Sequence, residues 1–167
     1  MAGIFSRDNR KKVPVAAITA TTDSNNYLRA LIPQYAPSES IFAIPGSVYT
    51  PSKPDENKSS LNEIIKKGEN YWAYVRGLKD TSNPTYPLLA DGFSSTVGTY
   101  AAADTAQGGQ WKGKKAIVIR VDQSGTIENA NASFQIFGQT GTGTAANIFV
   151  PTASWLTGTT VLNPLLP

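Results

Sequence analysis

Residues 71–93 decide the fold, and they read Tyr71-Trp72-Ala73-Tyr74-Val75-Arg76-Gly77, a polar link, then Asn83-Pro84-Thr85-Tyr86-Pro87-Leu88-Leu89-Ala90-Asp91-Gly92-Phe93. The aromatic and β-branched residues of the first part favour a pleated strand. Two prolines precede the apolar run of the second part, and proline suits the start of a strand because it donates no ladder hydrogen bond. We predict two short strands joined by a loop of about eight residues, with a turn at Asp91-Gly92. Trp72 or Tyr74 should lie in the core of the sheet.

Downstream of this stretch, the pattern predicts further short strands and long loops. Residues 94–109 are small, polar and glycine-rich, which indicates a long loop with room for a short strand at 97–100. Residues 115–122 and 126–128 flank Gln-Ser-Gly and predict a β-hairpin. The rest divides into a strand or short helix at 133–137, a glycine and threonine loop at 138–143, a short strand or bridge at 148–150, and an apolar tail at 155–166 that we expect to pack against the body.

Upstream, two helices are predicted. Asp23-Ser24 can cap a helix over 24–32, which Pro33 ends. Residues 40–44 are apolar but lie between prolines, so we expect a strand or an extended crossing there. Ser60 and Glu63 form a capping box, and Gly68 supplies a left-handed cap, so a second helix is expected over 60–67.

Residues 1–22 are expected to be an irregular leader segment, with an edge strand at 13–18 as the alternative. Their basic residues indicate a solvated leader or, alternatively, a contact with phosphate or an anionic surface; they are Arg7, Arg10, Lys11 and Lys12.

Composition limits the classes of function. The 167 residues suit one domain over 1–167, with 40% hydrophobic and 16% charged residues and a net charge of +3. The chain has no cysteine, which excludes disulfides and thiolate metal sites, and no histidine, which removes the commonest general base and metal ligand. No apolar run approaches the roughly 18 to 20 residues of a membrane helix, and the N-terminus has no signal-peptide core, so we expect no membrane contact by this chain.

Trp111, Lys112, Lys114 and Lys115 are candidate contacts for a ligand or for nucleic acid. An aromatic ring among lysines can stack on a base and neutralise phosphates. The alternative is that the lysines protect the edge of a hairpin, because unpaired strand edges need charge to avoid aggregation.

Loop aspartates allow a calcium site, although no EF-hand spacing is present and loop aspartates are also common turn and cap residues; they are Asp80, Asp91, Asp104 and Asp122. The glycine-rich segments lack the full phosphate-loop pattern. The glutamates are separated, and no general acid/base pair stands out. We therefore predict no cofactor, apart from this calcium option, no catalytic residue and no enzymatic activity.

Four segments, in this order, resemble the head region of the type IV pilin and type II secretion pseudopilin superfamily: 68–75, 78–84, 87–93 and 109–118. The resemblance covers about residues 23–126 and implies an α+β fold, in which a long N-terminal helix packs on an antiparallel sheet with short helices and long loops. This chain lacks the basic leader and apolar helix of that family, so we expect a trimmed head domain with that helix absent or truncated, or else a divergent relative.

The resemblance also implies a function. Such proteins are non-catalytic structural subunits of cell-envelope filaments, located in the periplasm or at the cell surface, and their partners are other pilin or pseudopilin subunits, bound through the N-terminal helix missing here. The alternatives are a minor pilin-like protein whose loops bind nucleic acid, a glycan or a host-surface ligand, and an unrelated sugar-binding or enzymatic domain. An aromatic groove would favour the sugar and converging carboxylates would favour the enzyme.

Overall fold

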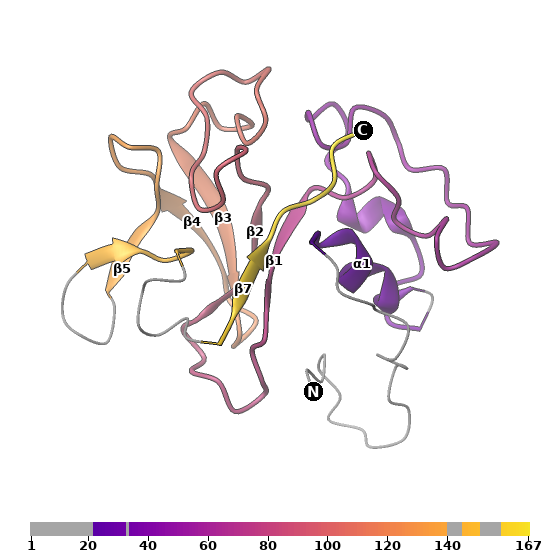
Figure 1. Ribbon diagram of the computed structural model, residues 1–167, viewed down its shortest axis with the longest axis horizontal. Helices are drawn as coiled ribbons and strands as arrows, with labels where there is room; N and C mark the ends of the chain where they lie inside the picture. The colour runs from indigo at the N-terminus through magenta and orange to yellow at the C-terminus, as the bar shows by residue number, and fades with distance from the viewer. Residues whose placement is uncertain (1–21, 33, 140–144, 151–157) are drawn as a thin grey trace.

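A five-stranded antiparallel sheet forms the centre of the protein. The computed structural model describes residues 22–32, 34–139, 145–150 and 158–167. Within them the sheet has the order β4-β3-β2-β1-β7. Its strands are β1 (Trp72–Arg76), β2 (Pro87–Asp91), β3 (Lys115–Arg120), β4 (Gly125–Asn129) and β7 (Thr160–Leu162), and a separate two-stranded sheet pairs β5 (Phe137–Gln139) with β6 (Ala145–Asn147) (Figure 1).

The two strands predicted for the organising stretch form, but the turn predicted at Asp91-Gly92 does not, because β2 runs to Asp91 and no turn follows it. β1 and β2 pair antiparallel, with Tyr74 opposite Leu89. The predicted hairpin is also confirmed, since β3 pairs with β4 along five residue pairs. Tyr74 is buried at 7% exposure, whereas Trp72 is partly exposed, so the expected buried aromatic is Tyr74.

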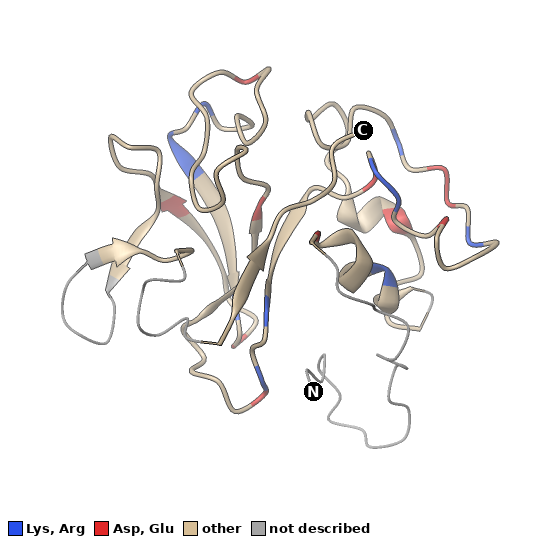
Figure 2. Ribbon diagram, viewed as in Figure 1, with Lys and Arg blue, Asp and Glu red and all other residues tan. Residues whose placement is uncertain are grey.

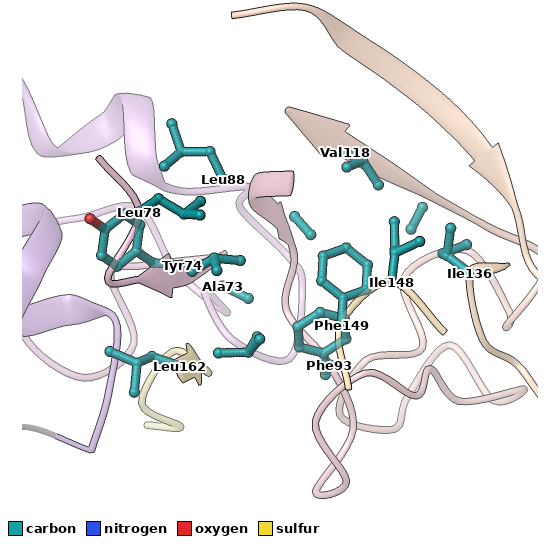
Figure 3. Packing of buried hydrophobic residues seen from close by; sticks show 14 of the residues in the cluster. Ala73, Tyr74, Leu78, Leu88, Phe93, Val118, Ile136, Ile148, Phe149 and Leu162 are labelled. Atoms are coloured by element: carbon teal, nitrogen blue, oxygen red, sulfur yellow. The ribbon is translucent and has the colours of Figure 1, made fainter. Parts of the chain in front are cut away.

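The face of the sheet formed by the small residues of β1 to β3 packs on aromatic rings. Ala73, Ala90 and Val118 lie beside one another across three strands and are almost fully buried. They belong to the same cluster as Phe93 and Phe149, whose ring centroids are 4.8 Å apart (Figure 3). Small side chains on the strands leave room for these rings, which join the 94–113 loop and the β5–β6 sheet to the main sheet.

On the opposite face lies α1 (Asn25–Leu28), continued by the 3₁₀ turn η2 (Arg29–Leu31). The expected helix over 24–32 therefore exists, as one α-helical turn followed by a tighter one. Asp23 caps it, because its Oδ1 accepts from the backbone of Asn26 at 3.1 Å, and Ser24 Oγ instead donates to the Trp72 carbonyl at 2.7 Å. Ser24, which lies between this cap and the helix, thus fastens the helix to β1.

The C-terminal tail joins the sheet. Val161 and Leu162 of β7 are buried, and Val161 pairs with Val75 of β1. Asn163 then binds the backbone of Phe93, with its Oδ1 2.8 Å from the Phe93 nitrogen. The described part of the tail therefore packs against the body, but as an edge strand beside β1 and not over a face of the sheet, and Leu165 and Leu166 stay exposed. Residues 155–157 and the predicted segments at 1–21 and 140–143 lie outside the described residues.

Residues 60–67 do not form the predicted helix. The structure has only turns there, and Ile65 has a φ of +47°. Its backbone N–H donates to Glu39 Oε1 at 3.3 Å, and its carbonyl accepts from Asn25 Nδ2 at 3.1 Å. The capping-box prediction is wrong because side chains from distant segments take the backbone groups that a helix would pair within itself.

Residues 40–44 are likewise not a strand. The structure has a 3₁₀ helix, η3 (Glu39–Phe42), and Ser38 accepts from Ser40 as its cap. No strand forms at 97–100. At 133–137 the chain makes a turn, a bridge from Ile136 to Ala130, and then β5, while β6 ends just before the expected bridge at 148–150.

The predicted α+β class with a long helix packed on the sheet is wrong for the described residues. Their helical structure consists of α1, η2 and η3, each three or four residues long, and the sheets dominate. The protein is mainly β. Across the described segments there is no helix with the length and apolar character needed to cross a bilayer.

Candidate functional site

An apolar surface crosses the sheet on the side of α1. Residues paired directly across an antiparallel ladder point to the same face, as do residues two apart on one strand. Leu89 is paired with Ile119, and Ile117 is paired with Ile127. Leucine and isoleucine side chains therefore run from β2 across β3 to β4 on one face.

The short helical segment covers only part of this face. Tyr27 of α1 packs on Tyr74, with ring centroids 5.5 Å apart, and Leu28 is buried. Beyond them an apolar groove of about 200 Å³ opens between the helix and the sheet; its lining residues are Tyr27, Leu28, Leu31, Tyr35, Tyr74, Leu88 and Leu89.

Several apolar side chains of the groove and the neighbouring strands remain in contact with solvent. Ile127 is 65% exposed and Tyr35 is 47% exposed, and the others are partly buried. We call this set the apolar face; its members are Leu31, Tyr35, Leu89, Ile117, Ile119 and Ile127. A contiguous apolar surface of this kind marks an interaction site or an aggregation liability.

The chemistry of the apolar face limits what it can bind. Its six side chains carry one polar atom, the Tyr35 hydroxyl, and the groove adds only the hydroxyls of Tyr27 and Tyr74. A sugar or an extended peptide would therefore bring donors and acceptors that find few partners. An α-helix pairs its own backbone groups and can present a purely apolar stripe. The distance from β2 to β4 is roughly 10 Å, which matches the diameter of a helix.

The predicted ligand contacts Trp111, Lys112, Lys114 and Lys115 lie together before and at the start of β3, but most of them have partners within the protein. Trp111 Nε1 donates to Asp91 Oδ2 at 2.6 Å, and Lys115 Nζ lies 4.7 Å from the centre of the indole ring. Lys112 is paired with Asp104 at 3.2 Å. The ring and two of the three lysines thus already have partners within the protein, and Figure 2 shows lysine and arginine positions spread over several parts of the ribbon.

The four loop aspartates do not come together among the described residues. Asp80 and Asp104 are exposed, and Asp122 is exposed in the β3–β4 turn, where it accepts from Ser124. Asp91 is buried in β2, at 1% exposure. The interpretation of these aspartates as turn residues agrees with the position of Asp122. Among the described residues, the four aspartates do not form a common metal site.

Asp91 is instead the centre of a buried polar group. Burial raises the pKa of Asp91 to about 6, although hydrogen bonds from the Ile117 backbone and Trp111 oppose this. The Tyr71 hydroxyl lies near enough to Asp91 to lower the pKa of the carboxyl, but Asp91 Oδ1 and the hydroxyls of Tyr71 and Tyr100 make no hydrogen bond of ordinary geometry among the described residues. Burial, with the nearby Asp91 charge next, raises the pKa of both tyrosines.

Three other carboxylates converge, although their spacing along the chain does not indicate it. One oxygen from each of Glu39, Asp55 and Glu69 lies within 4.8 Å of the other two. Such a set of oxygens suits a hard divalent cation. These are the described residues that could hold a metal ion.

Sequence reasoning missed both the carboxylate cluster and the apolar face. The three carboxylates are far apart along the chain and come from η3 and two loops, so no periodicity relates them. The sequence indicated part of the apolar face, because Ile117, Ile119 and Ile127 alternate with other residues along their strands. This alternation does not show which face of the sheet stays uncovered.

Comparison with known proteins identifies no relative: no family model, no curated protein and no solved structure matches this chain.

Proposed function

We propose that this chain is a non-catalytic structural subunit of a cell-envelope filament, and that its apolar face receives an α-helix of a neighbouring subunit. The observation that carries the proposal is the apolar face itself, which extends from the groove beside α1 across β2 and β3 to Ile127 on β4. Burial of an apolar surface is the main driving force of most protein association.

The geometry favours a helix as the occupant. A strand would add to a sheet at an edge, where backbone groups are free, and the apolar face lies on the broad side of the sheet. A helix with an apolar stripe could bury Ile127 and Tyr35 together without leaving backbone groups unpaired. The resemblance of residues 68–118 to filament subunits, whose assembly depends on helices, supports the same choice and an envelope location.

The proposal does not depend on the long helix of pilin heads, which the described fold does not contain. It needs only a helix from another subunit. A second candidate, nucleic-acid binding at Trp111 and its lysines, has weaker support because Lys112 and Lys115 already have partners within the protein.

Photo-crosslinking in intact cells tests the proposal. A crosslinking amino acid placed at Ile127 should join the protein to another envelope subunit, and mass spectrometry should map the linked peptide to the apolar stripe of a helix. The same amino acid at Ile41, which is 55% exposed in η3 and outside the apolar face, is the matched control. Equal crosslinking from both positions, or links from Ile127 to strands or loops only, would contradict the proposal.

A charge substitution gives a second readout. Ile127→Glu should remove the protein from filaments while leaving its thermal stability unchanged, because the side chain is exposed. Ile41→Glu should leave incorporation intact. Normal incorporation of Ile127→Glu would show that the apolar face takes no part in assembly.

A further inference from the structure

The carboxylate cluster of Glu39, Asp55 and Glu69 is built around one fully buried acid. Glu39 has 0% exposure, although glutamate is almost never fully buried without a partner. Its Oε1 accepts a hydrogen bond from the Ile65 backbone at 3.3 Å. Its Oε2 is buried and has no partner among the described residues. An unpaired carboxylate oxygen in the interior is costly unless something compensates its charge.

Backbone groups hold the other two carboxylates in place. Glu69 is also buried, and its oxygens accept from the backbone nitrogens of Asp55, at 3.2 Å, and Lys66, at 3.0 Å. Asp55 Oδ1 accepts from the Asn57 backbone at 2.9 Å. Each carboxylate is thus oriented by main-chain donors, as metal-binding carboxylates commonly are.

We propose that Glu39, Asp55 and Glu69 form a calcium-binding site that links η3 to the loops on either side of residues 60–67. Ca²⁺ binds oxygen ligands at about 2.3–2.6 Å, so two ligands on opposite sides of one ion lie about 4.6–5.2 Å apart. The three carboxylate oxygens all lie within 4.8 Å of one another, so they are close enough to contact one ion together. Mg²⁺ needs nearly ideal octahedral geometry at about 2.0–2.1 Å and usually keeps several waters and only one or two carboxylates, so three converging carboxylates suit Ca²⁺ better.

The charges around the cluster agree with this assignment. Burial raises the pKa of Glu39 and of Glu69, and for Glu39 the negative charges of Glu69, Glu56 and Asp55 add to the effect. A divalent cation would relieve both the burial cost and the repulsion between the carboxylates. The neighbouring Glu56 is already occupied, because it accepts hydrogen bonds from Ser38 and Ser40.

Lys66 is the competing cation within the protein. Its Nζ contacts Asp55 Oδ2 at 2.6 Å and Glu63 Oε2 at 3.2 Å, at a partly exposed position. Calcium that binds Asp55 must weaken this ion pair. Removal of the lysine charge should therefore strengthen calcium binding, whereas a purely structural carboxylate cluster would gain no affinity for the ion.

The site closes on its buried side and opens to solvent at Asp55, whose side chain is 45% exposed. An ion can therefore enter without unfolding the chain. Residues 43–70 contain no helix or strand, so a bound ion would stabilise a segment that has no regular secondary structure to hold it. This inference is independent of the apolar face and would stand if the proposed filament role failed.

Calorimetric titration of metal-free protein with CaCl₂ tests the proposal. We expect one ion per chain, a dissociation constant in the range of about 10⁻⁵–10⁻³ M, and a rise in Tm of a few degrees at saturating calcium. Asp55→Asn should weaken binding about tenfold or more, because ligand charge sets affinity. Lys66→Met should strengthen it several-fold.

Controls separate the outcomes. Asp122→Asn, an exposed aspartate in the β3–β4 turn, should leave binding unchanged. Glu39→Gln keeps the shape of the buried side chain and should abolish binding; its folding is checked by circular dichroism, and Asp55→Asn decides the matter if the Glu39 variant does not fold. Absence of calcium binding by the wild type, equal binding of Mg²⁺, or unchanged affinity in Asp55→Asn would each overturn the assignment. If the wild type does not bind calcium, the three carboxylates form a cluster that only shares protons.

Discussion

The indole nitrogen of Trp111 donates a 2.6 Å hydrogen bond to Oδ2 of Asp91, a buried carboxylate at the end of the central strand of the sheet. The contact fastens the loop before β3 to the end of β2. The stability of the charged form of Asp91 depends on the donors to this oxygen, which also accepts from the Ile117 backbone. The other oxygen makes no hydrogen bond of ordinary geometry with the described residues.

Stability should fall as the pH rises from about 4 to 6, because of Asp91. Its pKa in the folded protein, about 6, is raised above the ordinary value of 3.8. In that window the folded state binds more protons than the unfolded state, so deprotonation costs up to about 3 kcal/mol. Urea unfolding at pH 4, 5, 6 and 7 should show this loss in the wild type relative to Asp91→Asn. Parallel pH profiles for the two proteins would contradict it; the comparison cancels the contributions of other carboxylates.

Trp111→Phe should destabilise the protein by about 1.5–3 kcal/mol at pH 7, because a hydrogen bond to a charged, buried oxygen is lost. The matched control is the same substitution in an Asp91→Asn background, where the cost should be smaller. Chemical unfolding of the four proteins measures the coupling energy. Strictly additive effects would show that the indole contributes only by packing.

Phe93→Ala should cost about 3–5 kcal/mol, since the ring is fully buried between Tyr100 and Phe149. Phe137→Ala is the matched control, because this ring is 46% exposed on β5 and its loss should cost less than about 1 kcal/mol. Thermal unfolding compares them. Similar losses of Tm in both variants would argue against the core described here.

Gly109→Ala should destabilise the protein by about 1–3 kcal/mol or more, because a Cβ there would overlap the carbonyl oxygen of Ala103. At Gly125, in β4, a Cβ would meet no atom within 4 Å, so Gly125→Ala should be neutral or slightly stabilising. Expression level and unfolding midpoint report the difference. A tolerated Gly109→Ala would mean that the 94–113 loop adapts freely.

Binding to single-stranded DNA should be weak at low salt and lost at about 150 mM salt, because two of the three lysines beside Trp111 have partners already. Fluorescence anisotropy across a salt series tests this. Lys114→Gln should reduce any low-salt binding, and Lys79→Gln, at another exposed lysine, should not. Tight binding that persists at high salt would favour the nucleic-acid alternative over the structural role.

Local pattern was sufficient for β1, β2 and the β3–β4 hairpin. The β-branched and aromatic residues of these strands favour an extended backbone locally, and turn residues mark the ends of the strands. The observed strand pairing agrees with these local preferences. The burial of Tyr74 followed from the same pattern. The helix over 24–32 was also predictable, since Asp23 does cap it, though with one α-helical turn.

By itself, then, the sequence determined the central strands, the excess of loops, and the absence of histidine and cysteine chemistry. Only the tertiary structure decided that residues 60–67 would not be a helix, since Asn25 and Glu39 bind the Ile65 backbone from distant segments. It alone decided that Glu39, Asp55 and Glu69 meet, and that Ile127 stays exposed beside Ile117. The physical reason is range: strand and turn preferences act between neighbours in the chain, whereas carboxylate clusters and uncovered faces depend on which remote segments approach and which do not.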